Sequence, residues 1–202
     1  MNLWVPEGHR STLAQPTSEL PPQPVLFLDR DGVVIQERHY LSNPELVCLI
    51  PGSDDAMRMA KDNGFWLVGI SNQSGIGRGK LTMNDFEAVQ KRVDFLLSKA
   101  GVRFDAFFFC PHAPENNCSC RKPKPGLLEE AARWLPWDPK QSWIVGDKIS
   151  DLELARRTGL NGVLVRTGYG QDQAVQLSES DPFVVAADLA DAVRIILAGE
   201  EA

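Results

Sequence analysis

The chain is poor in cysteine, has fewer basic than acidic residues and lacks long apolar runs, and each shortage excludes a class of protein. Only 4 of the 202 residues are cysteine, whereas a secreted disulfide scaffold carries more of them, spread along the chain. No run of about 18 consecutive apolar residues is present, so the sequence predicts no membrane-spanning helix. The net charge of −6, from 21 basic and 27 acidic side chains, argues against broad binding to nucleic-acid phosphates.

The remaining composition is typical of a soluble globular protein. Apolar residues make up 43% of the chain and charged residues 24%, and this length suits one ordinary domain, or one domain with a small appendage. No basic segment followed by an apolar one stands at the start, so no secretory signal is readable and we expect a cytoplasmic protein. Three of the four cysteines lie within eleven residues, and in a reducing compartment such a cluster binds metal more often than it forms disulfides.

The pattern divides the chain into an arm, residues 1–24, and a domain, residues 25–202. The arm has no periodicity and five prolines, so we expect an extended segment that is poorly ordered unless it docks on the domain. In the domain, short apolar runs alternate with amphipathic stretches. The predicted strands are 25–28, 65–70, 104–109, 143–145, 163–165 and, more weakly, 183–186. The predicted helices are 53–63, 82–100, 125–135, 150–158 and 188–198.

This alternation predicts an α/β fold, a doubly wound parallel sheet with helices on both faces. Thr82 and Ser150 have the residue type and spacing of helix N-caps. Glycines stand where helices should end, at Gly64, Gly101 and Gly159. Ligands of such sheets bind beyond the carboxyl ends of the strands. The residues that directly follow the apolar runs are therefore the candidate site.

The first apolar run is followed by Asp29-Arg-Asp31-Gly. Carboxylates two residues apart leave a strand on the same side and repel each other unless a cation or a proton intervenes. The pair therefore suits a Mg²⁺ site, or a nucleophile beside an acid/base group. Asp-Gly is equally common in plain acidic turns, and this motif alone supports both interpretations about equally.

The second run is followed by a polar loop, Ser71 to Gly79, that contains hydroxyls, amides and three glycines. Such a loop suits an anion, because glycine lets the backbone approach it closely. The loop is neither a P-loop nor a dinucleotide fingerprint, since Ser74 and Lys80 stand where those motifs need glycine. Taken alone, it is better interpreted as a flexible polar loop.

The third run is followed by three thiols and an imidazole in the pattern C-x-H-x₅-C-x-C. This is a complete tetrahedral ligand set for a structural Zn²⁺, formed by Cys110, His112, Cys118 and Cys120. Few of the intervening residues favour secondary structure, so we expect the metal to order this loop. The alternative is three incidental thiols.

Further charges follow the cysteines and the next strand. Arg121, Lys122 and Lys124 form a cationic cluster that could bind a phosphoryl group or could be a solvated basic run. Asp147 leaves its strand as the first acidic motif does, and Asp151 lies near a helix start, where it could instead be a capping acid. These groups converge on one edge of the sheet, which favours a site.

In this order, the motifs resemble the haloacid dehalogenase superfamily of phosphatases. The matching segments are Asp29-Arg-Asp31-Gly-Val, Ser71-Asn-Gln-Ser74-Gly, Lys122 and Gly146-Asp147-x-x-x-Asp151. The segments Cys110-Pro-His112 and Cys120-Arg-Lys122-Pro narrow the resemblance to the subfamily of heptose bisphosphate and histidinol-phosphate phosphatases. It covers about residues 25–170. His39 stands where this subfamily has glycine, the metal loop is short, and Ser71 replaces the commoner threonine.

The resemblance implies roles for individual residues. Asp29 would be the nucleophile and Asp31 the general acid and base, while Ser71 and Lys122 would bind the phosphoryl oxygens. Catalytic Mg²⁺ would be held by Asp29, the backbone carbonyl of Asp31 and Asp147, with Asp151 as support. The implied substrate-binding residues are Glu37, Arg38, His39, Tyr40, Ser71, Asn72, Gln73, Ser74, Arg121, Lys122 and Lys148.

The resemblance also implies a function. We expect a Mg²⁺-dependent phosphatase, with structural Zn²⁺, that removes the 7-phosphate of D-glycero-D-manno-heptose 1,7-bisphosphate in the synthesis of nucleotide-activated heptose. A histidinol-phosphate phosphatase, or one for another small phosphorylated metabolite, is the alternative. A polynucleotide phosphatase is disfavoured because the acidic chain offers no basic track, and a non-catalytic zinc-binding module because the catalytic set is intact. The expected partner is a small phosphorylated sugar, with no nucleic acid and no membrane, and we expect a monomer.

Overall fold

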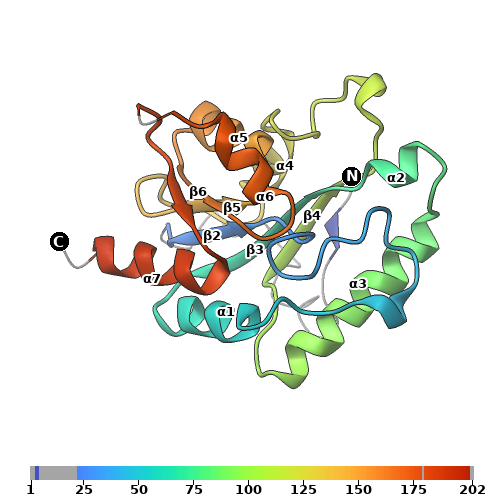
Figure 1. Cartoon of the computed structure of the whole chain (residues 1–202), viewed down its shortest axis with the longest axis horizontal. Coiled ribbons are helices and arrows are strands. Elements are labelled where there is room, and N and C mark those ends of the chain that lie inside the picture. Colours follow the sequence, from blue (N-terminus) through green and yellow to red (C-terminus); the bar gives the residue numbers. More distant parts are fainter. Residues whose placement is uncertain (1–2, 5–21, 179, 201–202) are drawn as a thin grey trace.

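The fold is organised around one seven-stranded sheet (Figure 1). The computed structural model describes residues 3–4, 22–178 and 180–200. The strand order is β1-β4-β3-β2-β5-β6-β7, and every neighbouring pair except β1 and β4 is parallel. The strands are β1 (Leu3–Trp4), β2 (Val25–Leu28), β3 (Trp66–Asn72), β4 (Ala106–Cys110), β5 (Trp143–Gly146), β6 (Asn161–Val165) and β7 (Val184–Ala186).

The strand order is that of a doubly wound sheet. From central β2 the chain continues outward through β3 and β4, returns to β5 on the other side of β2, and continues outward through β6 and β7. The order in which strands are added to the sheet reverses between β2 and β5, and this leaves a crevice at the carboxyl ends of these two parallel strands. Ligands bind there in such folds. The fold class predicted from the sequence is therefore confirmed, and each of the six predicted strands is present.

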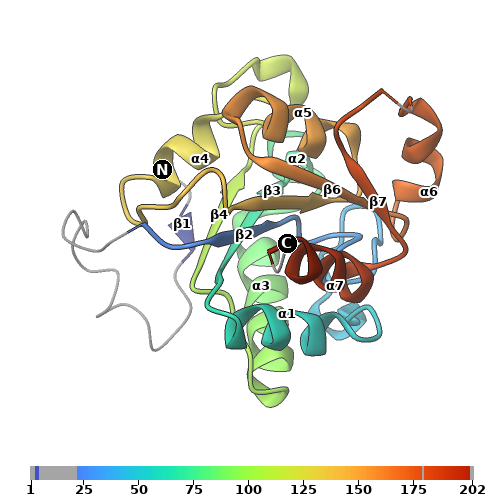
Figure 2. The same ribbon diagram turned by 90° about the vertical axis from the view of Figure 1, so that its left-hand side faces the viewer.

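Helices cover both faces of the sheet (Figure 2). One face carries α1 (Ser53–Asp62), α3 (Met83–Lys99) and α7 (Leu189–Glu200), and the other carries α4 (Gly126–Ala131) and α5 (Ile149–Thr158). The short helices are α2 (Ser74–Gly77), α6 (Gly170–Gln173) and the 3₁₀ turns η1 (Pro44–Leu46), η2 (Pro114–Asn116) and η3 (Ala174–Gln176). Among the described helices, none has both the length and the apolar character needed to cross a membrane.

The two cores follow from the period-two alternation of side chains along the strands. Leu26 and Leu28 belong to the larger core, under α1, α3 and α7, while Val25 and Phe27 belong to the smaller one, under α4 and α5. All four side chains are buried, which explains why β2 is a continuous apolar run rather than an alternating one.

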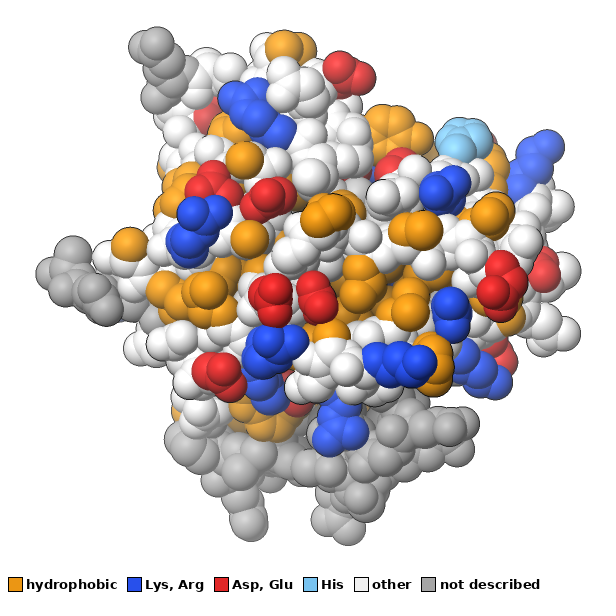
Figure 3. Space-filling view, turned by 60° about the horizontal axis from the view of Figure 1, so that its bottom comes forward, with side chains coloured by type: hydrophobic (Ala, Val, Ile, Leu, Met, Phe, Trp, Pro, Cys, Tyr) orange, Lys and Arg blue, Asp and Glu red, His pale blue; other side chains and the backbone are white. Residues whose placement is uncertain are grey.

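On the face of the molecule that Figure 3 shows, the Lys and Arg side chains lie among Asp and Glu side chains.

One of the two predicted helix caps is correct. Thr82 caps α3 in a capping box with Asp85. Ser150 is not a cap, because α5 begins at Ile149 and its N-cap is Lys148, whose N–H donates to Asp151 Oδ2 at 3.2 Å. The sequence rule favoured the hydroxyl residue, but the carboxylate of Asp151 closes the helix end. The three glycines expected at helix ends all have positive φ angles.

The edge of the sheet holds a strand that the sequence did not predict. Leu3 and Trp4 pair antiparallel with Phe108 and Phe107 of β4, so this part of the arm docks on the domain. Two residues are too few to give a periodic signal, which is why the pattern missed them. The expectation for the rest of the arm falls mainly on residues 5–21, outside the described part of the chain, and the boundary at residue 25 stays a prediction.

Candidate active site

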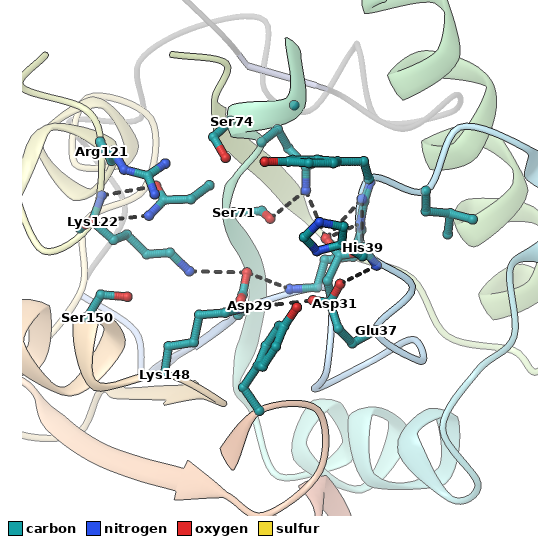
Figure 4. A pocket seen from close by; sticks show the side chains of 17 residues that line it. Asp29, Asp31, Glu37, His39, Ser71, Ser74, Arg121, Lys122, Lys148 and Ser150 are labelled. Atoms are coloured by element: carbon teal, nitrogen blue, oxygen red, sulfur yellow. Dashed lines mark hydrogen bonds and ion pairs between the residues drawn. The ribbon is translucent and has the colours of Figure 1, made fainter. Parts of the chain in front are cut away.

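The carboxyl ends of the central strands bring the predicted catalytic side chains together (Figure 4). Asp29 follows β2, Ser71 lies near the end of β3, and Lys122 comes from the loop after β4. All three line one cavity of about 240 Å³. Asp147 follows β5 and is fully buried beside Asp29. The topology therefore places four residues, separated by up to 118 positions (from 29 to 147), at one end of the sheet.

Asp29 is buried and rigidly held. Its Oδ1 atom accepts a hydrogen bond from the N–H of Arg30 at 2.9 Å and lies 3.1 Å from Lys122 Nζ. Burial by itself would raise the pKa of this carboxyl, but the charges of Lys122 and Lys148, together with the hydrogen bonds from Lys122 and Arg30, hold the pKa below its usual value. A buried carboxylate that stays ionised beside a cavity is a competent nucleophile.

Lys122 is fixed by three oxygen atoms. Its Nζ lies 2.6 Å from Asp151 Oδ1 and 3.1 Å from Asp29 Oδ1, and it donates to the carbonyl of Ile70 at 2.7 Å. Burial would lower the pKa of this ammonium, but Asp151 and Asp29 more than compensate, so the pKa is raised. Lys122 therefore keeps its positive charge in the floor of the cavity.

Asn72 positions the backbone of Lys122. Its amide donates to the Lys122 carbonyl at 3.1 Å, and its Oδ1 accepts from the Lys122 N–H at 3.0 Å. This pair of bonds joins the end of β3 to the loop that follows β4. Asn72 lines the cavity, as expected, but both hydrogen bonds of its side-chain amide go to the backbone of Lys122. The sequence motif did not indicate this role, because the two residues are fifty positions apart.

A cluster of three buried acids lies beside the cavity. One carboxylate oxygen from each of Asp29, Asp147 and Asp151 lies within 4.8 Å of the others. Burial, followed by the charge of Asp29, raises the pKa of Asp147 to about 7. Glycine is required around Asp147, since a Cβ added at Gly32 or Gly168 would lie 2.3 Å from its Oδ2. Hard cations such as Mg²⁺ prefer such oxygen ligands, so the cluster can hold one.

Asp31 is held by Arg30, a residue for which the sequence predicted no role. Arg30, only 1% exposed, donates to both carboxylate oxygens of Asp31 at 2.9–3.2 Å. Gln73 Nε2 donates to Asp31 Oδ2 at 2.8 Å and to Ser71 Oγ at 2.9 Å. Nothing in the motif predicted that the arginine between the two acids would turn inward rather than to solvent.

The predicted substrate-binding residues lie in the cavity wall, with one exception. Those that line it are Glu37, His39, Tyr40, Ser71, Asn72, Gln73, Ser74, Arg121, Lys122 and Lys148. Arg38 lies outside; it is exposed, donates to Gln36 and lines a neighbouring hollow. The structure adds wall residues that the sequence did not predict, namely Arg30, Leu41, Gly75, Ser150 and Tyr169.

Two further cations, Arg121 and Lys148, lie in the wall of the cavity. Arg121 Nη1 is buried and has no hydrogen-bond partner among the described residues. Lys148 Nζ lies 3.1 Å from Asp147 Oδ1, 3.7 Å from Glu37 Oε2 and 4.6 Å from the centre of the Tyr169 ring. These cations suit an anionic ligand whose charge extends beyond a single phosphoryl group.

The four predicted metal ligands of the loop after β4 also come together. The ligand atoms are the Sγ atoms of the three cysteines and Nδ1 of the histidine, in Cys110, His112, Cys118 and Cys120. Three Sγ–Sγ distances and two Sγ–Nδ1 distances lie between 3.2 and 3.6 Å. A tetrahedral ion with bonds of about 2.0–2.3 Å separates its ligand atoms by about 3.3–3.8 Å. The set therefore fits one tetrahedral metal ion. The remaining cysteine, Cys48, is exposed and does not belong to the cluster.

This metal loop is bonded to the catalytic edge of the sheet. The N–H of Gln73 donates to the Cys110 carbonyl, and the N–H of Gly77 donates to the Pro111 carbonyl, both at 2.7 Å. A Cβ added at Gly77 would lie 2.4 Å from the backbone nitrogen of Ala113. Since Cys120 is only two residues before Lys122, the order of this loop bears directly on the catalytic lysine.

Known proteins share this architecture. Residues 119–192 match a family model described as HAD-hydrolase-like. The D-glycero-beta-D-manno-heptose-1,7-bisphosphate 7-phosphatase of Salmonella typhi is 40% identical over 153 residues, which are 72% of this chain and 81% of that protein. The Yersinia pestis protein of the same name is 41% identical with the same coverage. The chain belongs to this phosphatase family.

A solved structure agrees with this membership. The D,D-heptose 1,7-bisphosphate phosphatase from B. bronchiseptica, complexed with magnesium and phosphate, superposes with a TM-score of 0.81 at 33% identity. The match covers 89% of this chain and 99% of that one. The family resemblance and the expectation of a phosphoric monoester hydrolase are thereby confirmed. The roles of individual site residues stay predictions.

Proposed function

We propose that the protein is a Mg²⁺-dependent phosphatase that removes the 7-phosphate of D-glycero-D-manno-heptose 1,7-bisphosphate through an aspartyl-phosphate on Asp29. The observation that carries the proposal is the ionised, buried Asp29 carboxylate, paired with Lys122 at 3.1 Å at the floor of the cavity. The relatives supply the substrate, because they bear the name of that phosphatase. A cytoplasmic location and a monomeric state stay predictions.

In the first half of the reaction, a carboxylate oxygen of Asp29 attacks phosphorus and the bond from phosphorus to the sugar O7 breaks. Asp31 gives its proton to O7, so the sugar leaves as an alcohol. In the second half, Asp31 takes a proton from a water molecule, which attacks phosphorus, releases inorganic phosphate and restores Asp29. The bonds from Arg30 and Gln73 give Asp31 one orientation for both transfers.

The chain's own cations stabilise the transferred phosphoryl group. Phosphoryl transfer depends mainly on positioning and on compensation of charge over the phosphoryl oxygens. Lys122 Nζ lies next to the proposed nucleophile, Asp29. The Gln73 amide donates to both Ser71 Oγ and Asp31. We therefore assign Lys122 and Ser71 to the phosphoryl oxygens. Arg121, whose buried Nη1 has no hydrogen-bond partner in the described part of the chain, and Lys148 are assigned to the rest of the doubly phosphorylated sugar.

The buried acids fit a divalent cation. Asp29, Asp147 and the backbone carbonyl of Asp31 would hold Mg²⁺, and when bound it supplies positive charge to the phosphoryl oxygens. Asp151 is assigned a supporting role, because its oxygens already face Lys122 Nζ and the Lys148 N–H. For the cysteine loop we propose Zn²⁺, since thiolates and imidazole in a closed tetrahedral set are typical of structural zinc.

A panel of phosphate esters tests the function. We expect kcat/KM for the heptose 1,7-bisphosphate to exceed that for histidinol phosphate and for a 3′-phosphorylated oligonucleotide by about 100-fold or more. Histidinol phosphate has no second phosphate for the cations of the wall, and the acidic chain offers no basic track for an oligonucleotide strand. Phosphate release measures the rate, and ³¹P NMR of the product shows which phosphate has left. Faster turnover of histidinol phosphate, or loss of the 1-phosphate, would contradict the proposal.

Asp147→Asn tests the cation site. The change removes one of three crowded negative charges, so we expect no loss of stability in EDTA, whereas activity falls about 100-fold or more. Addition of Mg²⁺ should raise the melting temperature of the wild type, since a ligand stabilises the state that binds it, and should leave that of the variant unchanged. An equal Mg²⁺-induced shift in both proteins would place the ion elsewhere.

A further inference from the structure

Two consecutive residues in the cavity wall have an unusual backbone. His39 and Tyr40 have φ angles of 36° and 56°, in the left-handed region that side chains rarely adopt. His39 stands at the position where glycine was expected, and its backbone keeps a conformation that glycine would allow. Strained backbone of this kind persists only where surrounding contacts over-determine it, often at ligand sites. Both residues line the cavity that contains Asp29, and Figure 4 shows His39 beside it.

Contacts inside the wall hold part of this segment. The His39 N–H donates to Glu37 Oε1 at 2.7 Å, and the centres of the His39 and Tyr40 rings lie 4.5 Å apart. The Tyr40 ring also packs on the turn of α2, since a Cβ added at Gly75 would lie 2.7 Å from Tyr40 Cδ1. The segment therefore lies against the loop that follows β3.

One side chain outside the cavity completes the arrangement. Arg78, directly after α2, donates through Nη1 to the Tyr40 hydroxyl at 2.9 Å, and its Nη2 lies 3.4 Å from Glu115 Oε1 of η2. A single guanidinium thus joins the strained segment, the turn of α2 and the metal loop. The pair with Glu115 is long and its carboxylate is 72% exposed, so it contributes little, and the bond to Tyr40 is the contact that matters.

We propose that Arg78 is a positioning residue that fixes the His39–Tyr40 segment over the cavity and so selects the part of the substrate beyond the transferred phosphoryl group. The inference rests on the proposed function for the identity of that substrate. Arg78 acts through Tyr40, because it is not among the residues that line the cavity. Among the described residues, the contacts that hold Asp29, Asp31 and Lys122 do not involve Arg78, so we expect phosphoryl transfer itself to be independent of it.

Kinetics with two substrates test this division. We expect Arg78→Met to raise KM for the heptose 1,7-bisphosphate about tenfold, with kcat within about twofold, as for loss of a hydrogen bond to a charged group. Hydrolysis of p-nitrophenyl phosphate, which has no sugar, should stay within about twofold of wild type. Tyr40→Phe should raise the sugar KM similarly, and the double variant no further, since the two changes remove the same contact.

Two controls and one independent measurement complete the test. Arg58→Met removes an arginine that is also 42% exposed and ion-paired, on α1, and Glu115→Gln removes the weak partner; both should behave like the wild type. Amide hydrogen exchange over residues 37–41 should be faster in Arg78→Met and in Tyr40→Phe than in wild type.

The outcomes separate this inference from the proposed function. Unchanged exchange over residues 37–41, or an equal loss with both substrates, would overturn the role of Arg78. Additive effects of Arg78→Met and Tyr40→Phe on the sugar KM would overturn it as well. If the wild type releases no phosphate from the heptose bisphosphate, the proposed function fails, and hydrogen exchange alone then decides whether Arg78 fixes the segment.

Discussion

Asp29→Asn is expected to abolish phosphate release from the heptose 1,7-bisphosphate, with kcat lower by about 10⁴-fold or more, because the amide cannot serve as the nucleophile. The fold should survive. An asparagine keeps an oxygen for the Arg30 N–H that now donates to Asp29 Oδ1, and Lys122 keeps its partner Asp151 at 2.6 Å. Phosphate release in steady state measures the loss, and thermal melting shows that the protein remains folded.

Two further variants show whether Asp29 is the nucleophile rather than a support for it. Asp31→Asn keeps the nucleophile, so p-nitrophenyl phosphate, whose leaving group needs no acid, should give a burst of p-nitrophenol followed by slow turnover. Asp29→Asn should give no burst. Asp62→Asn, at an exposed position at the end of α1, should match the wild type. Turnover by Asp29→Asn above about a hundredth of the wild-type rate would refute the assignment.

Cys120→Ser is expected to remove the metal of the loop and to lower stability and activity together. Structural zinc contributes about 10 kcal/mol or more in small peptides. Here the loop is anchored at the carbonyls of Cys110 and Pro111 by backbone hydrogen bonds, so part of its order should remain. A loss of about 3 kcal/mol would lower the melting temperature by about 10 °C. Activity should fall because Lys122, two residues further on, loses its fixed position.

Metal content, thermal melting and kcat/KM measured on the same preparations check this prediction. Cys48→Ser is the matched control, since Cys48 is exposed and outside the cluster, and it should keep the metal, the stability and the activity. If neither the wild type nor Cys48→Ser contains zinc, the assignment of zinc to the loop is wrong. A Cys120→Ser variant that lacks zinc but keeps full activity would show that the loop does not position Lys122.

The site was predictable wherever its chemistry is local in sequence. Asp29 and Asp31 directly follow a buried apolar run, and period-two alternation sends both carboxylates to the same side. The cysteine cluster was readable because four ligands at short spacing define a metal set without knowledge of the fold. The sheet itself followed from the alternation of apolar runs with amphipathic helices, because a parallel sheet needs helices on both faces.

Predictions were less reliable where two neighbouring residues could each cap a helix or face the cavity. Ser150 has the residue type of an N-cap, yet Asp151 closes the end of α5 through the Lys148 N–H. Arg38 lies in the expected substrate segment, yet its side chain is outside the cavity. In both cases the residue types were right for the motif, and the path of the backbone decided which side chain faced the site.

By itself, the sequence determined the fold class, the strands of the parallel sheet and the residue types at their carboxyl ends, because these depend on short-range periodicity. Only the tertiary structure decided which distant groups meet. Asn72 bonds the backbone of Lys122, Arg30 turns inward to Asp31, and Arg78 reaches Tyr40. Local patterns carry no information about such pairings, because the contacts form only when the strand order and the packing of the folded chain bring distant residues together. The strained His39–Tyr40 backbone is of the same kind, because neighbouring elements impose it.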